Sequence, residues 1–228
     1  MTDAPTVVPI IPMKPLKDAK SRLSEQLSDG ERADLTLGML RRVLTAIRAA
    51  DIDLFWVVGG DERIRNLARN FDGLWLEDFG RNLNDTMSKS FGQAHERGYS
   101  ALYLPGDLPF IKPADLHTLL RASGHRKNIT LAPARQDGGT NGILVPLGMA
   151  FQPELGPRSF TRHLGQAGKL GISVAICYSP GLGFDLDTVA DLNAYEHMEP
   201  DLRQRLIPKR GAATDQRAEA GGSYDISD

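Results

Sequence analysis

The sequence is poor in the residues that build disulfides and metal clusters. Its 228 residues include a single cysteine, Cys177, so neither an internal disulfide nor a cysteine-based metal cluster can form. The five histidines show no spacing typical of metal ligands. We therefore expect Cys177 to be a core residue, and nothing in the composition calls for an oxidising compartment.

The chain also lacks a large excess of charge and any long apolar run. The formal net charge is −2, which argues against a basic nucleic-acid-binding surface. No stretch is long enough to span a bilayer, and the N-terminal segment carries an acid where a signal peptide would be basic. These absences favour a cytoplasmic enzyme or binding protein with neither a nucleic acid nor a membrane as its partner.

Several common catalytic motifs are missing as well. The chain has no Walker P-loop, and the segment VVGGDERIRN lacks the later glycines of the dinucleotide-binding fingerprint. It also has no G-x-S-x-G nucleophile elbow and no Ser-His-Asp arrangement. The sequence therefore argues against a P-loop phosphotransferase, a Rossmann dehydrogenase and a serine hydrolase.

Apolar β-branched runs alternate with amphipathic stretches along most of the chain. We expect strands at 6–11, 54–60, 74–76, 100–107, 128–134, 141–147 and 171–178, and helices at 28–50, 61–71, 83–97, 112–123 and 188–195. Because 41% of the residues are hydrophobic, the chain can bury a sizeable core. The pattern predicts one α/β domain over residues 1–202, with a mostly parallel, Rossmann-like sheet and helices on both faces. Residues 203–228 lose this periodicity and are expected to form a disordered tail.

Two acidic positions follow predicted strands or precede a predicted helix. Asp107 ends the segment ALYLPGD, and Asp187 directly precedes Thr188, a candidate helix N-cap. Open α/β sheets bind ligands at the carboxyl ends of their strands, so these carboxylates could meet at one edge and share a divalent cation such as Mg²⁺. Each aspartate taken alone, and Asp185 with Asp187, could equally be a helix cap, a turn former or a solvated strand end.

A basic loop lies between the first strand and the first long helix. It contains Lys14, Lys17, Lys20 and Arg22 within nine residues. Such cations could line a triphosphate, because they compensate phosphate charge. The alternative is a solvated, lysine-rich surface loop.

These motifs together resemble one known family. The segments PMKPLKDAKSRLS, LPGDLPF, DGGTNGILV, LGPRSFTRHL and GLGFDLDTVADL, in this order, are similar to the guanylyltransferase of deazaflavin coenzyme F-420 biosynthesis. The resemblance covers roughly residues 7–195. It implies a single-domain nucleotidyltransferase that uses Mg²⁺ and GTP to activate a small phosphorylated three-carbon acid.

The resemblance also implies roles for individual residues. It assigns the GTP phosphates to Lys14, Lys20 and Arg22, Mg²⁺ to Asp107 and Asp187, a nucleotide contact to Asn84, and the acceptor acid to Thr140 or Asn141, Gly156 and Ser159. Apart from the resemblance, a glycine at Gly106 would let the backbone pass close to the nucleotide. Lys20 and Asp107 would be the catalytic pair.

Some of these assignments have competing interpretations. Asn82 or Asn84 could instead cap a helix. His163 is expected to lie on a helix surface, although it could approach the acceptor, and Arg158 or Arg162 could bind the acceptor's carboxylate or phosphate.

The predicted reaction transfers GMP to phosphoenolpyruvate, 2-phospho-L-lactate or 3-phospho-D-glycerate, with release of pyrophosphate. The product would pass to the next enzyme of coenzyme F-420 biosynthesis. The sequence leaves a homodimer open. Two other functions are compatible with the sequence. A molybdopterin or sugar-phosphate nucleotidyltransferase would share the sheet and both aspartates, and a non-catalytic regulator would bind a nucleotide without turnover.

Overall fold

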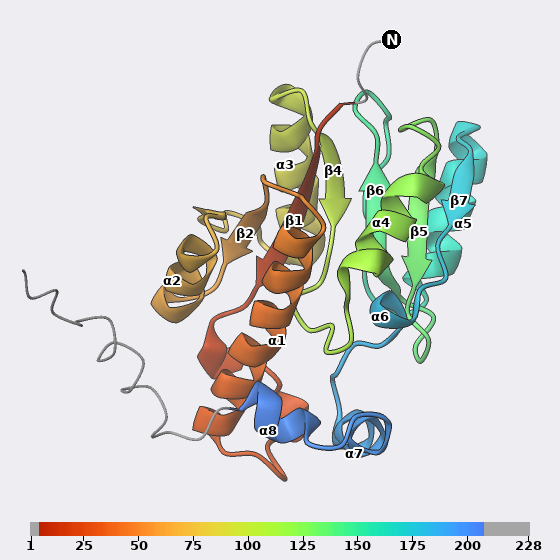
Figure 1. Ribbon diagram of the computed structural model, residues 1–228. Coiled ribbons are helices and arrows are strands. Elements are labelled where there is room, and N and C mark those ends of the chain that lie inside the picture. The colour runs from red at the N-terminus through yellow and green to blue at the C-terminus, as the bar shows by residue number, and fades with distance from the viewer. Residues whose placement is uncertain (1–4, 208–228) are drawn as a thin grey trace, which may run out of the picture.

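The structure is a computed structural model that describes residues 5–207 of the chain (Figure 1). Seven strands form one sheet in the order β3-β2-β1-β4-β6-β5-β7. They are β1 (Val7–Met13), β2 (Trp56–Gly59), β3 (Leu74–Leu76), β4 (Ser100–Tyr103), β5 (Ile129–Pro133), β6 (Thr140–Val145) and β7 (Val174–Ile176). Strands β3, β2, β1 and β4 are parallel, as are β5 and β7, whereas β6 is antiparallel to both of its neighbours. The predicted mostly parallel α/β sheet is confirmed.

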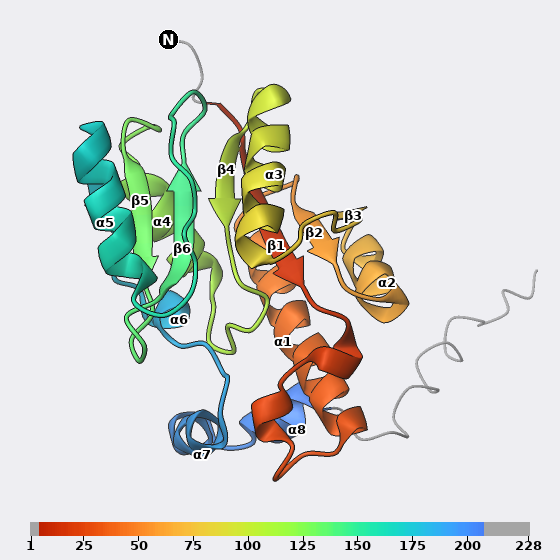
Figure 2. The same cartoon turned by 180° about the vertical axis from the view of Figure 1, so that it is seen from behind.

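Helices cover both faces of this sheet (Figures 1 and 2). One face carries α1 (Asp29–Ala49), α2 (Glu62–Asn70) and α4 (Pro113–Ala122), and the other carries α3 (Leu83–Glu96) and α5 (Ser159–Leu170). In β1, Val7 and Ile11 pack on the α1 side while Val8 and Ile10 pack on the α3 side. Successive strand residues point to opposite faces, so a central strand covered on both sides has an unbroken apolar sequence.

Local capping residues place the helix starts where the sequence predicts them. The Ser28 side chain accepts from the Glu31 amide, and the Glu31 carboxylate accepts from the Ser28 amide, which completes a capping box at α1. Asp61 caps α2, and Thr188 caps α7 (Val189–Met198). Cys177 is buried, as expected.

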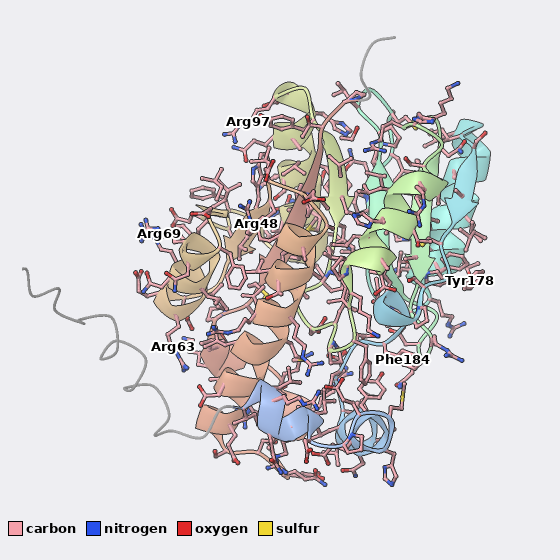
Figure 3. All side chains as sticks on the ribbon, viewed as in Figure 1. Arg48, Arg63, Arg69, Arg97, Tyr178 and Phe184 are labelled. Carbon is pink, nitrogen blue, oxygen red and sulfur yellow. The ribbon has the colours of Figure 1, made fainter. Side chains whose placement is uncertain are left out.

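A smaller apolar cluster joins the basic loop to the C-terminal helices. The loop forms two short 3-10 turns, η1 (Leu16–Asp18) and η2 (Ser21–Leu23), and the last helices of the described residues are α6 (Pro180–Gly183), α7 and α8 (Leu202–Leu206). Leu23 and Leu27 pack with Leu186, Leu192 and Leu206. Figure 3 shows Phe184 beside α7, where its ring packs edge-on against Tyr195.

The sequence predicts a boundary between domain and tail after residue 202, and helix α8 spans that position. Helix α8 continues the fold to Ile207, with Leu202 and Leu206 buried. It packs against α1 at Gly38, where a side chain would collide with the Leu206 backbone. The rest of the predicted tail, 208–228, lies outside the described residues. Among residues 5–207, no helix is long and apolar enough to cross a membrane.

Candidate active site

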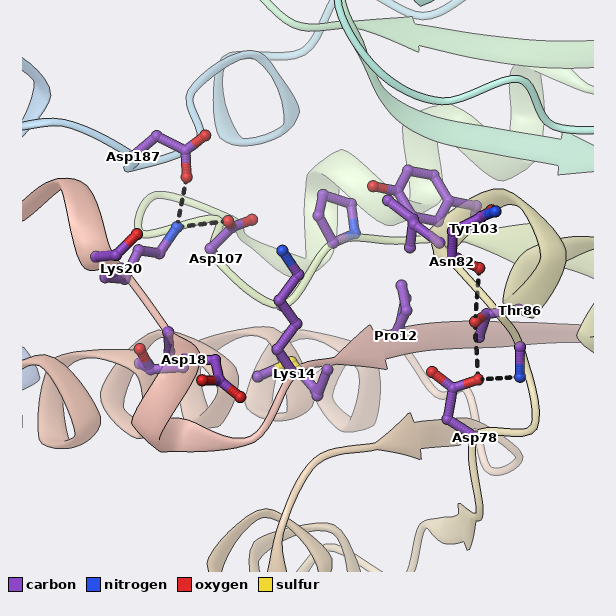
Figure 4. Close-up of a pocket in the computed structure, with 18 of the residues that line it drawn as sticks. Pro12, Lys14, Asp18, Lys20, Asp78, Asn82, Thr86, Tyr103, Asp107 and Asp187 are labelled. Carbon is purple, nitrogen blue, oxygen red and sulfur yellow. Dashed lines mark hydrogen bonds and ion pairs between the residues drawn. The ribbon is translucent and has the colours of Figure 1, made fainter.

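A cavity of about 580 Å³ lies at the carboxyl ends of β1 and β4. The basic loop, the turn after β4, the start of α3 and the segment before α7 all contribute to its walls (Figure 4). The residues predicted from the sequence that line it are Lys14, Lys20, Arg22, Gly106, Asp107 and Asp187. One cavity therefore brings the basic loop and the two aspartates together.

Lys20 lies between the two carboxylates at one end of this cavity. Its Nζ is 2.6 Å from Asp107 Oδ2 and 2.7 Å from Asp187 Oδ1 (Figure 4). The Lys20 side chain is 7% exposed, against 28% for Asp107 and 47% for Asp187. Burial by itself would lower the pKa of Lys20, but attraction to the two carboxylates outweighs it and raises that pKa above 10.5. The ammonium group is therefore charged across the physiological pH range.

The backbone explains why the two aspartates meet. Strand β4 ends at Tyr103, and the chain turns through Pro105 and Gly106 to Asp107. A Cβ on Gly106 would contact the Met13 sulfur, which accounts for glycine at this close approach to β1. The Leu186 amide donates to the Asp107 carbonyl at 3.2 Å and so holds the next residue, Asp187, beside the turn.

The N-terminus of α7 fixes Asp187. The Asp187 and Thr188 amides both donate to Asp191 Oδ2, at 3.0 and 2.7 Å. Burial would raise the pKa of Asp187, but Lys20, then Arg22 and Lys14, lower it below its usual value. Its carboxylate is therefore ionised at neutral pH, and the basic loop supplies the compensating charge.

The other end of the cavity is formed by the segment between β3 and α3. Figure 4 shows Asp78, Asn82 and Thr86 there, across the cavity from Lys20. Asp78 Oδ1 accepts from the Gly80 amide and from the Thr86 hydroxyl, both at 2.8 Å. Sequence reasoning did not single out Asp78, although its position just after β3 places it at the same edge of the sheet as Asp107.

Asn84 lies outside this cavity lining, and Asn82 lies in it. Asn82 accepts from the Asp85 amide and is the N-cap of α3. Asn84 accepts from the Leu155 amide at 2.7 Å and donates to the Leu155 carbonyl at 3.2 Å. In this structure Asn84 holds the segment before α5 and does not face the cavity, so its predicted nucleotide contact has no geometric support here.

The predicted acceptor residues form a second cluster beside the first. Strand β6 runs antiparallel to β4, so its first residues, Thr140 and Asn141, lie at the edge where β4 ends. Asn141 Nδ2 donates to Asp185 Oδ1 at 3.0 Å, and Ser159 Oγ donates to Thr140 Oγ1 at 3.1 Å. None of these four residues lines the large cavity. They adjoin it through Asp185, two residues before Asp187.

Asp185 is an ionisable group to which the sequence analysis assigns no catalytic or binding role. Burial, and then the nearby Asp107 charge, raise its pKa to about 6. Gly156, three residues before Ser159, has φ of +119°, a backbone conformation that favours glycine. Among the described residues no group of three or more His, Cys, Asp or Glu side chains is placed to hold a metal ion.

The expectation for His163 is wrong. Its side chain does not lie on a helix surface but is buried at 0% exposure, between β6 and the segment before α5. Of the two arginines considered for the acceptor, Arg162 donates to the backbone carbonyls of Glu154, Leu155 and Pro157, and Arg158 is exposed. Helical spacing predicts which residues share a face of α5 with His163, but it does not predict which face of the helix packs against the sheet.

The fold is that of nucleotidyltransferases of the nucleotide-diphospho-sugar transferase type. A crystal structure assigned to such a transferase from Desulfovibrio desulfuricans G20 superimposes with a TM-score of 0.71. The match covers 87% of this chain and 90% of that chain at 18% sequence identity, so it shows the fold alone.

Sequence comparison shows the family. The family model described as "Guanylyl transferase CofC like" matches residues 7–198. A phosphoenolpyruvate guanylyltransferase from Rubrobacter xylanophilus is 38% identical over 192 residues, which cover 84% of this chain and 94% of the relative. One from Sphaerobacter thermophilus is 35% identical over 189 residues, covering 82% and 91%. This chain belongs to the CofC-like guanylyl transferase family, and the resemblance read from its motifs is confirmed.

Proposed function

We propose that the protein transfers GMP from GTP to phosphoenolpyruvate, with release of pyrophosphate, as a step of coenzyme F-420 biosynthesis. The observation that carries this proposal is the Lys20 ammonium held between Asp107 and Asp187 in a cavity that Lys14 and Arg22 also line. Family membership supports guanylyl transfer, and the relatives, which are phosphoenolpyruvate guanylyltransferases, support phosphoenolpyruvate as the acid.

The chemistry requires charge compensation more than proton transfer. The acceptor phosphate is already ionised at neutral pH, so its oxygen can attack the α-phosphorus of GTP as pyrophosphate departs. No general base is needed, and the site must align two anions that repel each other. Lys14, Lys20 and Arg22 would compensate the triphosphate charge, and Gly106 would let the backbone approach the nucleotide. The base would extend toward the end of the cavity that Asp78 and Asn82 form.

Asp107 and Asp187 fit a magnesium ion by their chemistry. Both offer hard oxygen ligands, and Asp107 Oδ1 is buried without a hydrogen-bond partner among the described residues. Bound Mg²⁺ would act as a Lewis acid on the phosphate oxygens. Lys20 lies where both carboxylates converge, so its ammonium would turn toward the phosphates when these aspartates bind a cation.

The acceptor would lie where the second cluster adjoins the cavity. Thr140 and Ser159 offer hydroxyl groups there, and Gly156 offers backbone close to them. Asn141 donates one hydrogen bond to Asp185, and we take Thr140 as the acceptor contact of the two candidates. The cytoplasmic location, a homodimer and transfer of the product to a following enzyme stay predictions.

Pyrophosphate release tests the proposal. The purified protein is mixed with GTP, Mg²⁺ and, in separate reactions, phosphoenolpyruvate, 2-phospho-L-lactate or 3-phospho-D-glycerate. Turnover is expected with phosphoenolpyruvate. Turnover with another acid alone would correct the substrate. A molybdopterin or sugar phosphate as the only acceptor would indicate a different nucleotidyltransferase, and GTP binding with no turnover at all would indicate a regulator.

The Asp107→Asn variant tests the role of the carboxylate pair. It should abolish turnover and weaken Mg²⁺ binding while the thermal midpoint stays close to that of the wild type, because Lys20 keeps Asp187 as its partner. A collapse of stability would show that Asp107 is a structural residue.

A further inference from the structure

The ring of His163 joins the two segments to which the acceptor acid is assigned. The side chain is fully buried, and its ring packs against Phe151 with the ring centroids 5.8 Å apart. Nδ1 lies 3.0 Å from Thr140 Oγ1 on β6, and Nε2 lies 2.9 Å from the Glu154 amide nitrogen. His163 thus contacts both the start of β6 and the chain that leads to Gly156.

These two contacts fix the tautomer of the ring. A backbone amide can only donate, so Nε2 must accept the Glu154 hydrogen bond and carries no proton. A neutral ring then carries its proton on Nδ1, which donates to Thr140 Oγ1. Burial, and then the neighbouring Arg162, lower the pKa of His163 to about 4, so the ring is neutral at physiological pH.

The tautomer in turn decides what the Thr140 hydroxyl can do. A hydroxyl oxygen has two lone pairs and one proton. The Thr140 oxygen accepts from His163 Nδ1 and from Ser159 Oγ, so both lone pairs are engaged. Its own proton is left to donate, and the hydroxyl can serve a ligand only as a hydrogen-bond donor.

We propose that His163 is a positioning residue that keeps the Thr140 hydroxyl as a donor to an anionic oxygen of the acceptor acid. A carboxylate or phosphate oxygen accepts hydrogen bonds and donates none, so a donor-only hydroxyl matches such a group and disfavours a neutral hydroxyl-bearing substituent. This inference rests on the proposed function in one respect, the assignment of the acid to Thr140 and Ser159.

Two substitutions separate the two hydrogen bonds of the ring. His163→Asn places an amide NH₂ near the position of Nδ1 and keeps a donor for Thr140. His163→Gln places an amide oxygen near the position of Nε2 and keeps an acceptor for Glu154. If His163 only filled space in the core, the two substitutions would have similar effects on the KM for phosphoenolpyruvate.

Steady-state kinetics give the first test. His163→Gln should raise the KM for phosphoenolpyruvate about tenfold, the effect of one hydrogen bond to a charged group, while the KM for GTP stays unchanged. His163→Asn should stay within about threefold of the wild type. In a Thr140→Val background the His163→Gln effect on the KM should disappear. His197→Gln, at an exposed position of α7, is the control. Equal losses in both His163 variants, or a matching rise in the KM for GTP, would overturn the proposal.

The tautomer gives a second test that does not depend on any substrate. In protein labelled with ¹⁵N-histidine, NMR should show the His163 ring as the Nδ1–H tautomer, with no titration between pH 5.5 and 8. The ring resonances of His163 are assigned by their absence from the spectrum of His163→Asn. An Nε2–H tautomer or a protonated ring would refute the inference even if turnover is normal. The expected tautomer together with no turnover on any acid would instead point to failure of the proposed function.

Discussion

Replacing Lys20 by methionine tests the central charge cluster most directly. Methionine keeps the apolar stem and removes the ammonium group. Asp107 and Asp187 each contact the same Lys20 nitrogen, so their carboxylates lie no more than about 5 Å apart. Two unit charges at about 5 Å repel by about 3 kcal/mol at an effective dielectric constant of about 20, and by under about 1 kcal/mol in bulk water.

The exposure of the two aspartates decides between these limits. Asp187 is nearly half exposed and Asp107 is mostly covered, so solvent screens part of the repulsion. We expect the variant to lose about 1–2 kcal/mol of unfolding free energy at neutral pH, which corresponds to roughly 2–8 °C in the thermal midpoint for a chain of this size. The loss should shrink below pH 3.8, because Asp187, whose pKa is lowered in the fold, becomes protonated there.

Thermal unfolding at low salt, with and without Mg²⁺, is the assay. Mg²⁺ should raise the midpoint of Lys20→Met more than that of the wild type, because no ammonium then competes for the carboxylates. Lys17→Met is the control, since Lys17 is exposed on the same loop and outside the cavity lining. A Lys20→Met variant as stable as the wild type, and unaffected by Mg²⁺, would refute the idea that the two aspartates share one cation position.

Three further predictions concern stability. Gly38→Ala should destabilise the fold by about 1–3 kcal/mol in thermal unfolding, because its Cβ would collide with the backbone of α8. The control is Gly92→Ala in α3, whose Cβ meets open space and which should be neutral or stabilising. Equal thermal midpoints for the two variants would contradict the α8 contact. Asp185→Asn should be more stable than the wild type by about 1–3 kcal/mol in EDTA at pH 7.5, because a carboxyl whose pKa is raised to about 6 lowers the stability of the fold once it is ionised. This gain in stability should vanish near pH 4. An equal gain at both pH values would exclude ionisation of Asp185 as its cause. Arg42→Met should cost about 1 kcal/mol at pH 7, since it removes the ion pair to Glu199. The pKa of Glu199 is lowered by its hydrogen bond to Arg42, so chemical denaturation should show this cost fading below pH 4.5, and a pH-independent cost would point to packing instead.

Much of the fold follows from short-range patterns in the sequence. The apolar run of β1 and the periodicity of α1 predict those elements, and the Ser28 and Thr188 caps place two helix starts correctly. The last strand shows the limit of this reasoning. The sequence predicts a strand over 171–178, and only Val174–Ile176 pairs with β5, because pairing at the edge of the sheet depends on its neighbour.

The candidate site divides in the same way. Asp107 could be placed from the sequence, because it directly follows a predicted strand and the residues after parallel strands gather at one edge of the sheet. The basic loop could be placed for the same reason. Asp187 could not be placed in this way, because α6 lies between it and β7 and the Leu186–Asp107 backbone contact brings it to that edge. That Lys20, of its four cations, lies between the aspartates depends on the turns η1 and η2 and on where α7 packs.

The sequence by itself determined the alternation of strands and helices, the capped helix starts and the edge at which Asp107 and the basic loop lie, because these features depend on periodicity and on chain direction. Only the tertiary structure decided that His163 is buried against Thr140, that Asn84 holds Leu155 and leaves Asn82 in the cavity, and that α8 packs on Gly38. Each of these depends on which face of a helix is covered by a segment distant in the chain, and helical spacing gives the faces without naming what covers them.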